Sequence, residues 1–399
     1  MLSQEIEEKL AERLAQRINE ANTYILLKIG DGIKKLSTLN PSNANKLAQM
    51  LKYGGSYEEI AKKLSQISGK NIQDIYKIFE EIAKHNKDFA KQFYKYRHID
   101  FIPYSKDIAL QEQVKSLANI TAGTFLNFAK TTVVGYVFED LDGNRTFKNL
   151  EQTYQEVIDR AILSISQGKD SFYNSMRNTL KELGRSGLVE YQSGRTRRLD
   201  SAVRMNVLDG IRRLNRETSL RFGQEYNADG VEISVHSNPA PDHEDIQGKQ
   251  FSLEEFEKLE NGDIAVDYKN NKYDGSDKRH IGELNCYHKI FNIVLGVSKP
   301  LYSDDQLNKI KEENEKGFEF EGRHYTNYEG TQLQRKIELA IRKKKDIRAL
   351  AKSSGDKALE LDCNIEIDQL IHKYNDLCNI SGLRSQKQRM GSVKYESSN

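Results

Sequence analysis

VEISVHSNPAPDHEDIQGKQFSLEEFEKLENG, residues 231–262, and RHIGELNCYHKIFNIVLGV, residues 279–297, are the two halves of the stretch around which this chain is organised. The first half opens with apolar and polar residues in alternation, which predicts a β-strand. Ser252 followed by Glu255 is the pattern of a capping box, so a short helix is expected to begin there. The apolar run near the end of the second half predicts another strand. The stretch is therefore expected to form a compact α+β unit.

The same stretch concentrates residue types that bind metals or act as nucleophiles. It contains four of the eight histidines and one of the three cysteines of the chain. His236, His243, Cys286 and His288 are candidate zinc ligands, because zinc takes imidazole and thiolate ligands in proteins. Cys286 beside a histidine is also a candidate nucleophile. The spacing matches no standard zinc motif, and these side chains could instead fix loops by hydrogen bonds. We therefore expect no cofactor by default, with zinc as the alternative.

Amphipathic helices are predicted before this unit. Apolar residues recur at helical spacing over 4–29 and again over 56–96, where the polar segment 68–71 predicts a turn between two helices. Two helices joined by a turn also form DNA-binding helix-turn-helix motifs. The second helix here opens without a cluster of base-reading side chains, which favours an ordinary helical hairpin. Further helices are expected at 107–132 and 150–185, with a small β-excursion or a loop between them.

More helices are predicted after the unit. Ser303 is expected to cap a short helix, two long helices follow at 332–351 and 357–379, and the basic end of the chain is expected to be mobile or bound to a partner. The predicted fold class is mainly α with a central α+β domain and an extended helical N-terminal region. The predicted regions are 1–189, helical; 190–330, α+β; and 331–399, C-terminal helices and a basic tail.

Basic residues gather in two places, an arginine-dense segment at 184–225 and an RKKK run on the helix at 332–351. One interpretation is a surface that contacts DNA phosphates or an acidic partner, with an affinity that falls steeply as salt rises. The other interpretation is a solvated helix face with acidic neighbours. The candidate phosphate contacts are Arg195, Arg197, Arg198, Arg204, Arg212, Arg213, Arg342, Lys343, Lys344 and Lys345.

The composition argues against several classes of protein. The net charge is only +2, so the chain as a whole does not read as a nucleic-acid binder. Hydrophobic residues make up 37% and charged residues 30%, which favours extended helices and partner-covered surfaces over one large core. Three irregularly spaced cysteines predict a reducing compartment. No secretory signal is recognised, and no stretch approaches the roughly 18–20 apolar residues of a membrane span.

The central stretch resembles the head-morphogenesis domain of tailed-phage minor capsid proteins. It is most similar to the minor capsid protein 2 group, which is related to the Mu F-like minor head proteins. The similarity covers about 190–395, and the sequence has Ala240, Ile246 and Tyr287 where that family commonly has Arg, Trp and Arg. The residues that carry the resemblance, and that are expected to matter for structure or function, are His236, Asp242, His243, Gln247, Gly248, Asn285, Cys286 and His288.

The resemblance implies a structural, non-enzymatic protein of the phage head. Such proteins enter the procapsid in few copies and act near the portal, inside the head, in assembly, DNA packaging or DNA delivery. The implied partners are the portal and major capsid proteins and packaged double-stranded DNA, with no membrane; the implied location is the virion, after assembly in the host cytoplasm. A related domain occurs with toxin modules, so the alternative is a metal- or Cys/His-dependent enzyme acting on nucleic acid or a nucleotide. That alternative requires the histidines and Cys286 to converge around an open cleft.

Overall fold

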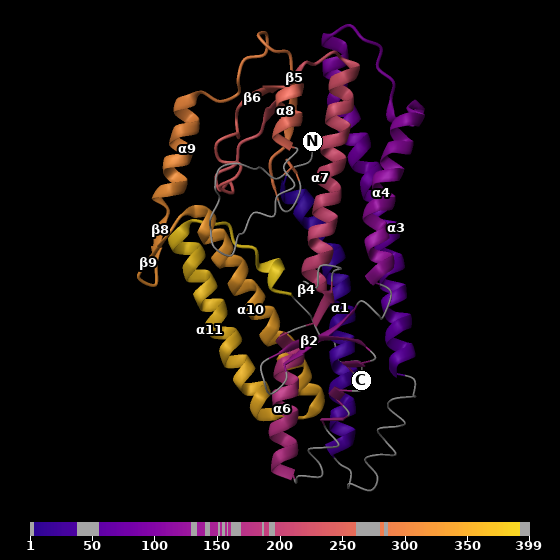
Figure 1. Ribbon diagram of the computed structural model, residues 1–399, viewed down its shortest axis with the longest axis vertical. Helices are drawn as coiled ribbons and strands as arrows, with labels where there is room; N and C mark the ends of the chain where they lie inside the picture. Colours follow the sequence, from indigo (N-terminus) through magenta and orange to yellow (C-terminus); the bar gives the residue numbers. More distant parts are fainter. Residues whose placement is uncertain are drawn as a thin grey trace.

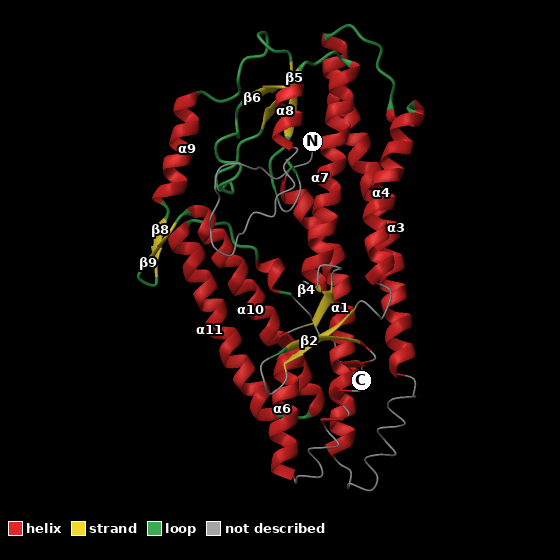
Figure 2. Ribbon diagram, viewed as in Figure 1, coloured by secondary structure: helices red, strands yellow, loops and turns green. Residues whose placement is uncertain are grey.

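A computed structural model describes most of the chain. The described residues are 4–37, 56–128, 134–139, 144–150, 152–153, 156–157, 159–160, 169–185, 187–190, 196–260, 280–282 and 286–391. Over these residues the protein is mainly helical with small sheets, which confirms the predicted fold class. Figure 2 shows the strands in separate groups among and beside the long helices. Among the helices that the structure describes, none has both the length and the apolar character needed to cross a bilayer.

The core of the molecule is built from long helices, with α1 and α7 packed against each other at the centre (Figure 1). In α1, side chains at helical spacing such as Leu14, Ile18 and Ile25 are fully buried, so the apolar stripe predicted from the sequence faces the core. The long helices are α1 (Gln4–Ser37), α3 (Ser56–Tyr96), α4 (Ile108–Phe128), α6 (Lys169–Arg185), α7 (Leu199–Glu225), α10 (Asn327–Ser354) and α11 (Lys357–Ser381).

The predicted helical hairpin at 56–96 is wrong, because α3 continues through the polar segment 68–71 without a turn. One of the polar residues that suggested a break, Asn71, contacts α1, and so does Asp74 shortly after it. Asn71 Nδ2 donates to the Leu14 carbonyl oxygen at 3.2 Å, and Arg17 pairs with Asp74 at 2.6 Å. Tertiary contacts therefore override the local turn preference. A helix-turn-helix motif is excluded here on the same ground.

A four-stranded antiparallel sheet, in the order β2-β1-β3-β4, lies beside α1 at the point where α7 begins (Figure 1). The predicted β-excursion is confirmed as the pair β1 and β2, whereas the other two strands were not predicted. The helices predicted at 107–132 and 150–185 are confirmed over α4 and α6, while 129–132 and 161–168 lie outside the described residues. The strands of this sheet are β1 (Val134–Glu139), β2 (Arg145–Asn149), β3 (Gly187–Glu190) and β4 (Thr196–Arg198).

The central stretch forms its own small core, as predicted. In the antiparallel sheet β6-β5-β7, the middle strand β5 (Gly230–Ile233) is buried along its length. Helix α8 (Leu253–Glu260) follows β6 (Gln250–Ser252), and its predicted capping box is present, with the Glu255 N–H donating to Ser252 Oγ at 3.2 Å. The last strand is β7 (Ile290–Ile293).

Short elements connect this unit to the C-terminal helices. Ser303 caps α9 (Asp304–Lys316) as expected, and β8 (Phe318–Phe320) pairs with β9 (Arg323–Tyr325). A further capping box, formed by Thr326 and Glu329, starts α10, and Gly355 in the left-handed conformation ends it. The remaining described elements are the 3-10 turns η1 (Tyr104–Lys106) and η2 (Lys387–Met390).

The described part of the basic tail, residues 382–391, packs against the protein itself, which corrects the prediction that this part is mobile. Residues 392–399 of the predicted tail lie outside the described residues. Met390 is buried in a core shared with α10 and α11, and Lys345 Nζ donates to the Gly391 carbonyl oxygen at 2.6 Å. The largest core draws residues from all three predicted regions, from Ala11 to Cys363. The predicted region boundaries themselves stay a prediction.

Candidate functional site

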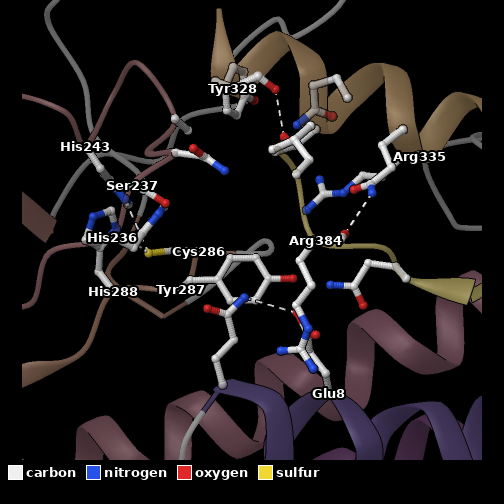
Figure 3. A pocket seen from close by; sticks show the side chains of 18 of the residues that line it. Glu8, His236, Ser237, His243, Cys286, Tyr287, His288, Tyr328, Arg335 and Arg384 are labelled. Carbon is white, nitrogen blue, oxygen red and sulfur yellow. Dashed lines mark hydrogen bonds between the residues drawn. The ribbon is translucent and has the colours of Figure 1, made fainter. Parts of the chain in front are cut away.

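A pocket of about 450 Å³ lies where the central unit meets the helices. Its walls come from segments far apart in the sequence: the loop after β5, the segment before β7, the start of α1, the start of α10, and the C-terminal segment. Figure 3 shows the histidines and Cys286 on one side of the pocket and Arg335 and Arg384 on the other. The lining residues used below are Glu8, His236, His243, Cys286, Tyr287, His288, Arg335, Arg384 and Arg389.

Three of the predicted metal ligands converge. His243, Cys286 and His288 are all buried, and their ligand atoms lie within 4.8 Å of one another. Cys286 Sγ is 3.3 Å from His243 Nδ1 and 3.4 Å from His288 Nδ1. His236 stacks against the cluster, with its ring centroid 4.3 Å from that of His288. Three of the four residues that the enzyme alternative names therefore converge, with His236 beside them, and the enzymatic role itself stays a prediction.

Two other motif residues orient the imidazole rings. Gln247 Oε1 accepts the backbone N–H of His236 at 3.2 Å, which identifies this atom as the oxygen of the amide. The same oxygen lies 3.2 Å from His288 Nε2, so this ring nitrogen must donate. On the other ring, Asp242 Oδ2 lies 3.5 Å from His243 Nε2. Both contacts favour a proton on Nε2, and in the neutral imidazole Nδ1 then presents its lone pair to Cys286 Sγ.

The backbone around β5 brings the cluster together. The Gly248 N–H donates to the Ile233 carbonyl oxygen at 2.8 Å, which folds the loop after β5 back on its own strand. Gly248 has a φ of 71°, and a Cβ there would lie 2.5 Å from Leu307 and 2.8 Å from Val235. Glycine is therefore needed at this position. Opposite, the Ser234 N–H donates to the Lys289 carbonyl oxygen at 2.7 Å, which sets the segment that carries Cys286 and His288 beside the loop.

The surroundings of Cys286 lower the pKa of its thiol. Burial is the largest single influence and would raise this pKa, but the contact with His243 and the backbone N–H groups of Gly282 and His288 together hold it below its ordinary value. The thiolate is the form of cysteine that acts as a nucleophile or a metal ligand, so these contacts make Cys286 a candidate for either role.

The opposite wall of the pocket is cationic. Arg335, Arg384 and Arg389 line it, and Arg389 Nη2 lies 3.4 Å from the Tyr287 hydroxyl. Arg212 is buried and does not line this pocket, but its Cζ lies 4.2 Å from the centroid of the same ring. Burial would raise the pKa of Tyr287, yet Arg389, Arg212 and Arg335 together hold it below its ordinary value. Glu8 balances part of this charge through a 3.1 Å ion pair with Arg389. The pocket thus combines a thiol–imidazole side with a side suited to an anionic group.

Several arginines predicted to contact phosphate lie inside the protein instead. Arg198 and Arg342 are buried between Asp200 and Asp346, with Arg198 Nη1 2.7 Å from Asp346 Oδ2 and Arg342 in contact with Asp200. Arg212 is buried beneath Tyr287. Because carboxylates or an aromatic ring cover these cations, no surface is left for DNA, and the prediction is wrong for these three.

The other predicted phosphate contacts have various surroundings. Arg204 Nε pairs with Glu12 at 2.7 Å, Lys344 pairs with Glu366, and Lys345 donates to the C-terminal segment. Arg197 is exposed, and Arg213 and Lys343 are partly exposed. For these residues DNA contact stays a prediction. Arg195 and the motif residue Asn285 lie outside the described residues.

Sequence reasoning did not assign Glu8, Arg335, Arg384 or Arg389 to the site. They come from α1, α10 and the C-terminal segment, residues 382–391. Glu8 is more than 300 residues from the three arginines along the chain, so no spacing rule connects them. Arg389 lies within residues 190–395, the part of the chain that resembles the family. This resemblance is the one feature of the sequence that pointed toward Arg389.

The comparison with protein families gives one match. The family described as phage minor capsid protein 2 matches residues 6–379, which is nearly the whole chain. No curated protein and no solved structure matches.

Proposed function

The chain belongs to the phage minor capsid protein 2 family, and from this premise we propose that it acts inside the phage head, at the portal, during assembly and DNA packaging. The family supports a structural capsid role in the virion. The observation that carries the proposal is the extent of the match, 6–379, which takes in the N-terminal helices as well as the central unit. The proposed partners are the portal and major capsid proteins.

Exposed apolar side chains support contacts with other subunits. Along α11, Leu361 is 60% exposed, Ile365 is 50% exposed and Ile380 is 56% exposed. On the other side of the core, Ile108 and Ile120 of α4 are 62% and 56% exposed. Large apolar side chains that gather on a helix surface are typical of protein-interaction sites. We propose that the α11 surface contacts the portal.

Packaged DNA is proposed as a neighbour of the protein rather than as its main ligand. The net charge of +2 offers little general attraction to phosphate. Much of the arginine that the sequence offers is paired with internal carboxylates, as in the ion pairs of Arg198 and Arg204. Any contact with DNA would therefore depend on exposed cations such as Arg197.

The test is incorporation into procapsids. Tagged protein is co-expressed with the capsid proteins, with or without portal, and its copies per shell are counted by quantitative mass spectrometry. We expect incorporation only with portal, cross-links between α11 and portal, and a several-fold loss of copies for Ile365→Glu. Val297→Glu is the matched control, because Val297 is also an apolar residue, is 74% exposed and lies outside α11. Equal incorporation into shells that lack portal would refute the proposed location.

An enzymatic function is the second candidate, and one observation favours it. The thiol–imidazole cluster and the arginines share one pocket of about 450 Å³, an arrangement suited to a nucleotide or a nucleic-acid end. Its test is incubation with labelled single- and double-stranded nucleic acid and nucleoside triphosphates, followed by product analysis. Turnover that disappears in Cys286→Ser would support an enzyme. If no product formed at any metal concentration, the enzymatic function would be refuted and only the structural role would remain.

A further inference from the structure

We propose that His243, Cys286 and His288 bind one zinc ion, with the fourth coordination position open to the pocket. The inference concerns the chemistry of this chain and holds whether or not the protein sits at the portal. It rests on the donor types, their separations, the orientation of the rings and the shape of the surroundings.

The separations fit a tetrahedral ion. With Zn–S near 2.3 Å and Zn–N near 2.0–2.1 Å, a tetrahedral site places a ligand sulfur and a ligand nitrogen about 3.5 Å apart. The two separations from Cys286 Sγ are 3.3 Å to His243 Nδ1 and 3.4 Å to His288 Nδ1. Both sulfur–nitrogen separations thus lie close to those that a shared zinc ion imposes, and all three ligand atoms lie within 4.8 Å of one another.

The orientation of the rings also suits a metal. With Asp242 beside His243 Nε2 and Gln247 beside His288 Nε2, both Nδ1 atoms face Cys286 Sγ. A cation bound between the sulfur and these two nitrogens would have all three donors directed at positive charge.

The surrounding residues act as a supporting shell. Metal-binding histidines usually donate their second N–H to a carboxylate or a carbonyl group, which fixes the ring and raises its affinity for the metal. Asp242, fully buried, lies beside His243 Nε2, and Gln247 Oε1 lies beside His288 Nε2. A buried aspartate and glutamine therefore have the positions that such partners take in zinc sites.

The donor set selects the kind of metal. One thiolate and two imidazoles suit zinc, whereas magnesium and calcium prefer oxygen ligands. All three ligands are buried but also line the pocket, so we place the open fourth position toward the pocket. His236 lies against His288 on that side and is assigned a neighbouring position, not a ligand position. Three protein ligands with an open fourth position is the arrangement found where zinc activates a bound water.

The ion would link two parts of the central unit. His243 lies in the loop between β5 and β6, and Cys286 and His288 lie just before β7, so binding joins segments separated by about 43 residues. Because ligand binding to the folded state alone stabilises that state, removal of the metal is expected to lower the melting temperature and to loosen this unit first.

The experiment measures metal in the full-length protein, purified without chelators and without a metal-affinity tag. We expect one zinc per chain by elemental analysis, retained on dialysis. After exchange into cobalt(II), we expect a thiolate-to-cobalt charge-transfer band. That band reports directly on a sulfur–metal bond and is independent of any activity. A protein that takes up no zinc even after incubation with excess zinc chloride overturns the proposal.

Variants locate the site. Cys286→Ser and His288→Ala should lose the ion, and Cys286→Ser should lose the charge-transfer band. Cys363→Ser is the matched control, since Cys363 is also buried but lies in a different core, and it should keep both. Asp242→Asn, which retains all three ligands, should weaken zinc affinity about 10- to 100-fold. Full stoichiometry and an unchanged band in Cys286→Ser would place the metal elsewhere, and loss of zinc in His236→Ala would overturn the open fourth position.

Discussion

Lys87 illustrates how single charged residues are held in this helical protein. The side chain is 1% exposed, and its Nζ lies 3.1 Å from Asp107 and 3.2 Å from Glu225. The rings of Tyr94 and Phe222 each lie with their centroids 4.9 Å from the same nitrogen. A buried cation is tolerated only where its charge is matched, and here two carboxylates from different elements do so.

Lys87→Met should therefore destabilise the protein by about 3 kcal/mol at neutral pH, because it leaves partly buried carboxylates without this cation. Arg221 still pairs with both carboxylates, which limits the loss. The measurement is chemical denaturation, with Lys77→Met, at an exposed position of α3, as a control expected to stay within about 0.5 kcal/mol of wild type.

The same substitution should change the response to acid. Burial alone would raise the pKa values of Asp107 and Glu225, but their hydrogen bonds and cationic neighbours hold both below their ordinary values. A lowered pKa contributes stability above the unfolded-state value, near pH 4, and that stability is lost as the pH falls further. The difference between wild type and Lys87→Met should therefore shrink below about pH 4. A constant difference from pH 7 to pH 3 would contradict this explanation.

At the scale of elements, two glycines show where a helix has room for a side chain and where it packs closely against its neighbours. Gly69 lies in α3, and a Cβ at this position would meet no atom within 4 Å, although the sequence around it predicted a turn. Gly210 in α7 is different, since a Cβ there would lie 2.3 Å from Thr121 Oγ1 and 3.0 Å from Phe79 Cζ. α7 can therefore approach α3 and α4 closely only because this residue has no side chain.

The pair gives opposite predictions for the same change. Gly69→Ala should stabilise the protein by about 0.5–1 kcal/mol, because alanine favours a helix and meets no neighbour. Gly210→Ala should destabilise it by about 1–3 kcal/mol through overpacking. Thermal and urea denaturation of the two variants measures both effects. If Gly69→Ala destabilised the protein, the continuous α3 helix would be contradicted.

At the scale of the whole molecule, the C-terminal segment joins the two ends of the described chain. Arg389 pairs with Glu8 of α1 at 3.1 Å, and both side chains are buried. Glu338 of α10 lies near the same cation; burial raises the pKa of this carboxyl above its ordinary value, although Arg389 opposes the shift. The C-terminal segment, residues 382–391, therefore lines part of the pocket and links α1 to α10.

Arg389→Met should destabilise the protein by about 3 kcal/mol, because the buried carboxylate of Glu8 loses its cation. Hydrogen exchange should rise in the first turns of α1 and in 382–391 together. Arg384→Met is the control: the ion pair of Arg384 with Glu5 is largely exposed, so its loss should cost less than about 1 kcal/mol. Faster exchange confined to 382–391 would mean that the segment does not fasten α1.

Local patterns in the sequence determined most of the elements. The 3.6-residue period of α1 and the caps at Ser252 and Ser303 each depend on residues a few positions apart, and the structure confirms them. His243, Cys286 and His288 were recognised by residue type and by resemblance to a family motif, and their role stays a prediction. The family itself was identified in this way, and its relation to Mu F-like proteins stays a prediction.

The tertiary structure decided how those residues are used. It made α3 continuous by pairing Asn71 with α1, buried Arg198 and Arg342 among carboxylates, and placed Arg389 opposite Cys286 in one pocket. The physical reason is common to all of them. Helix period and caps are local, whereas burial, charge pairing and the convergence of ligands depend on which distant segments meet, and a spacing along the chain does not contain that information.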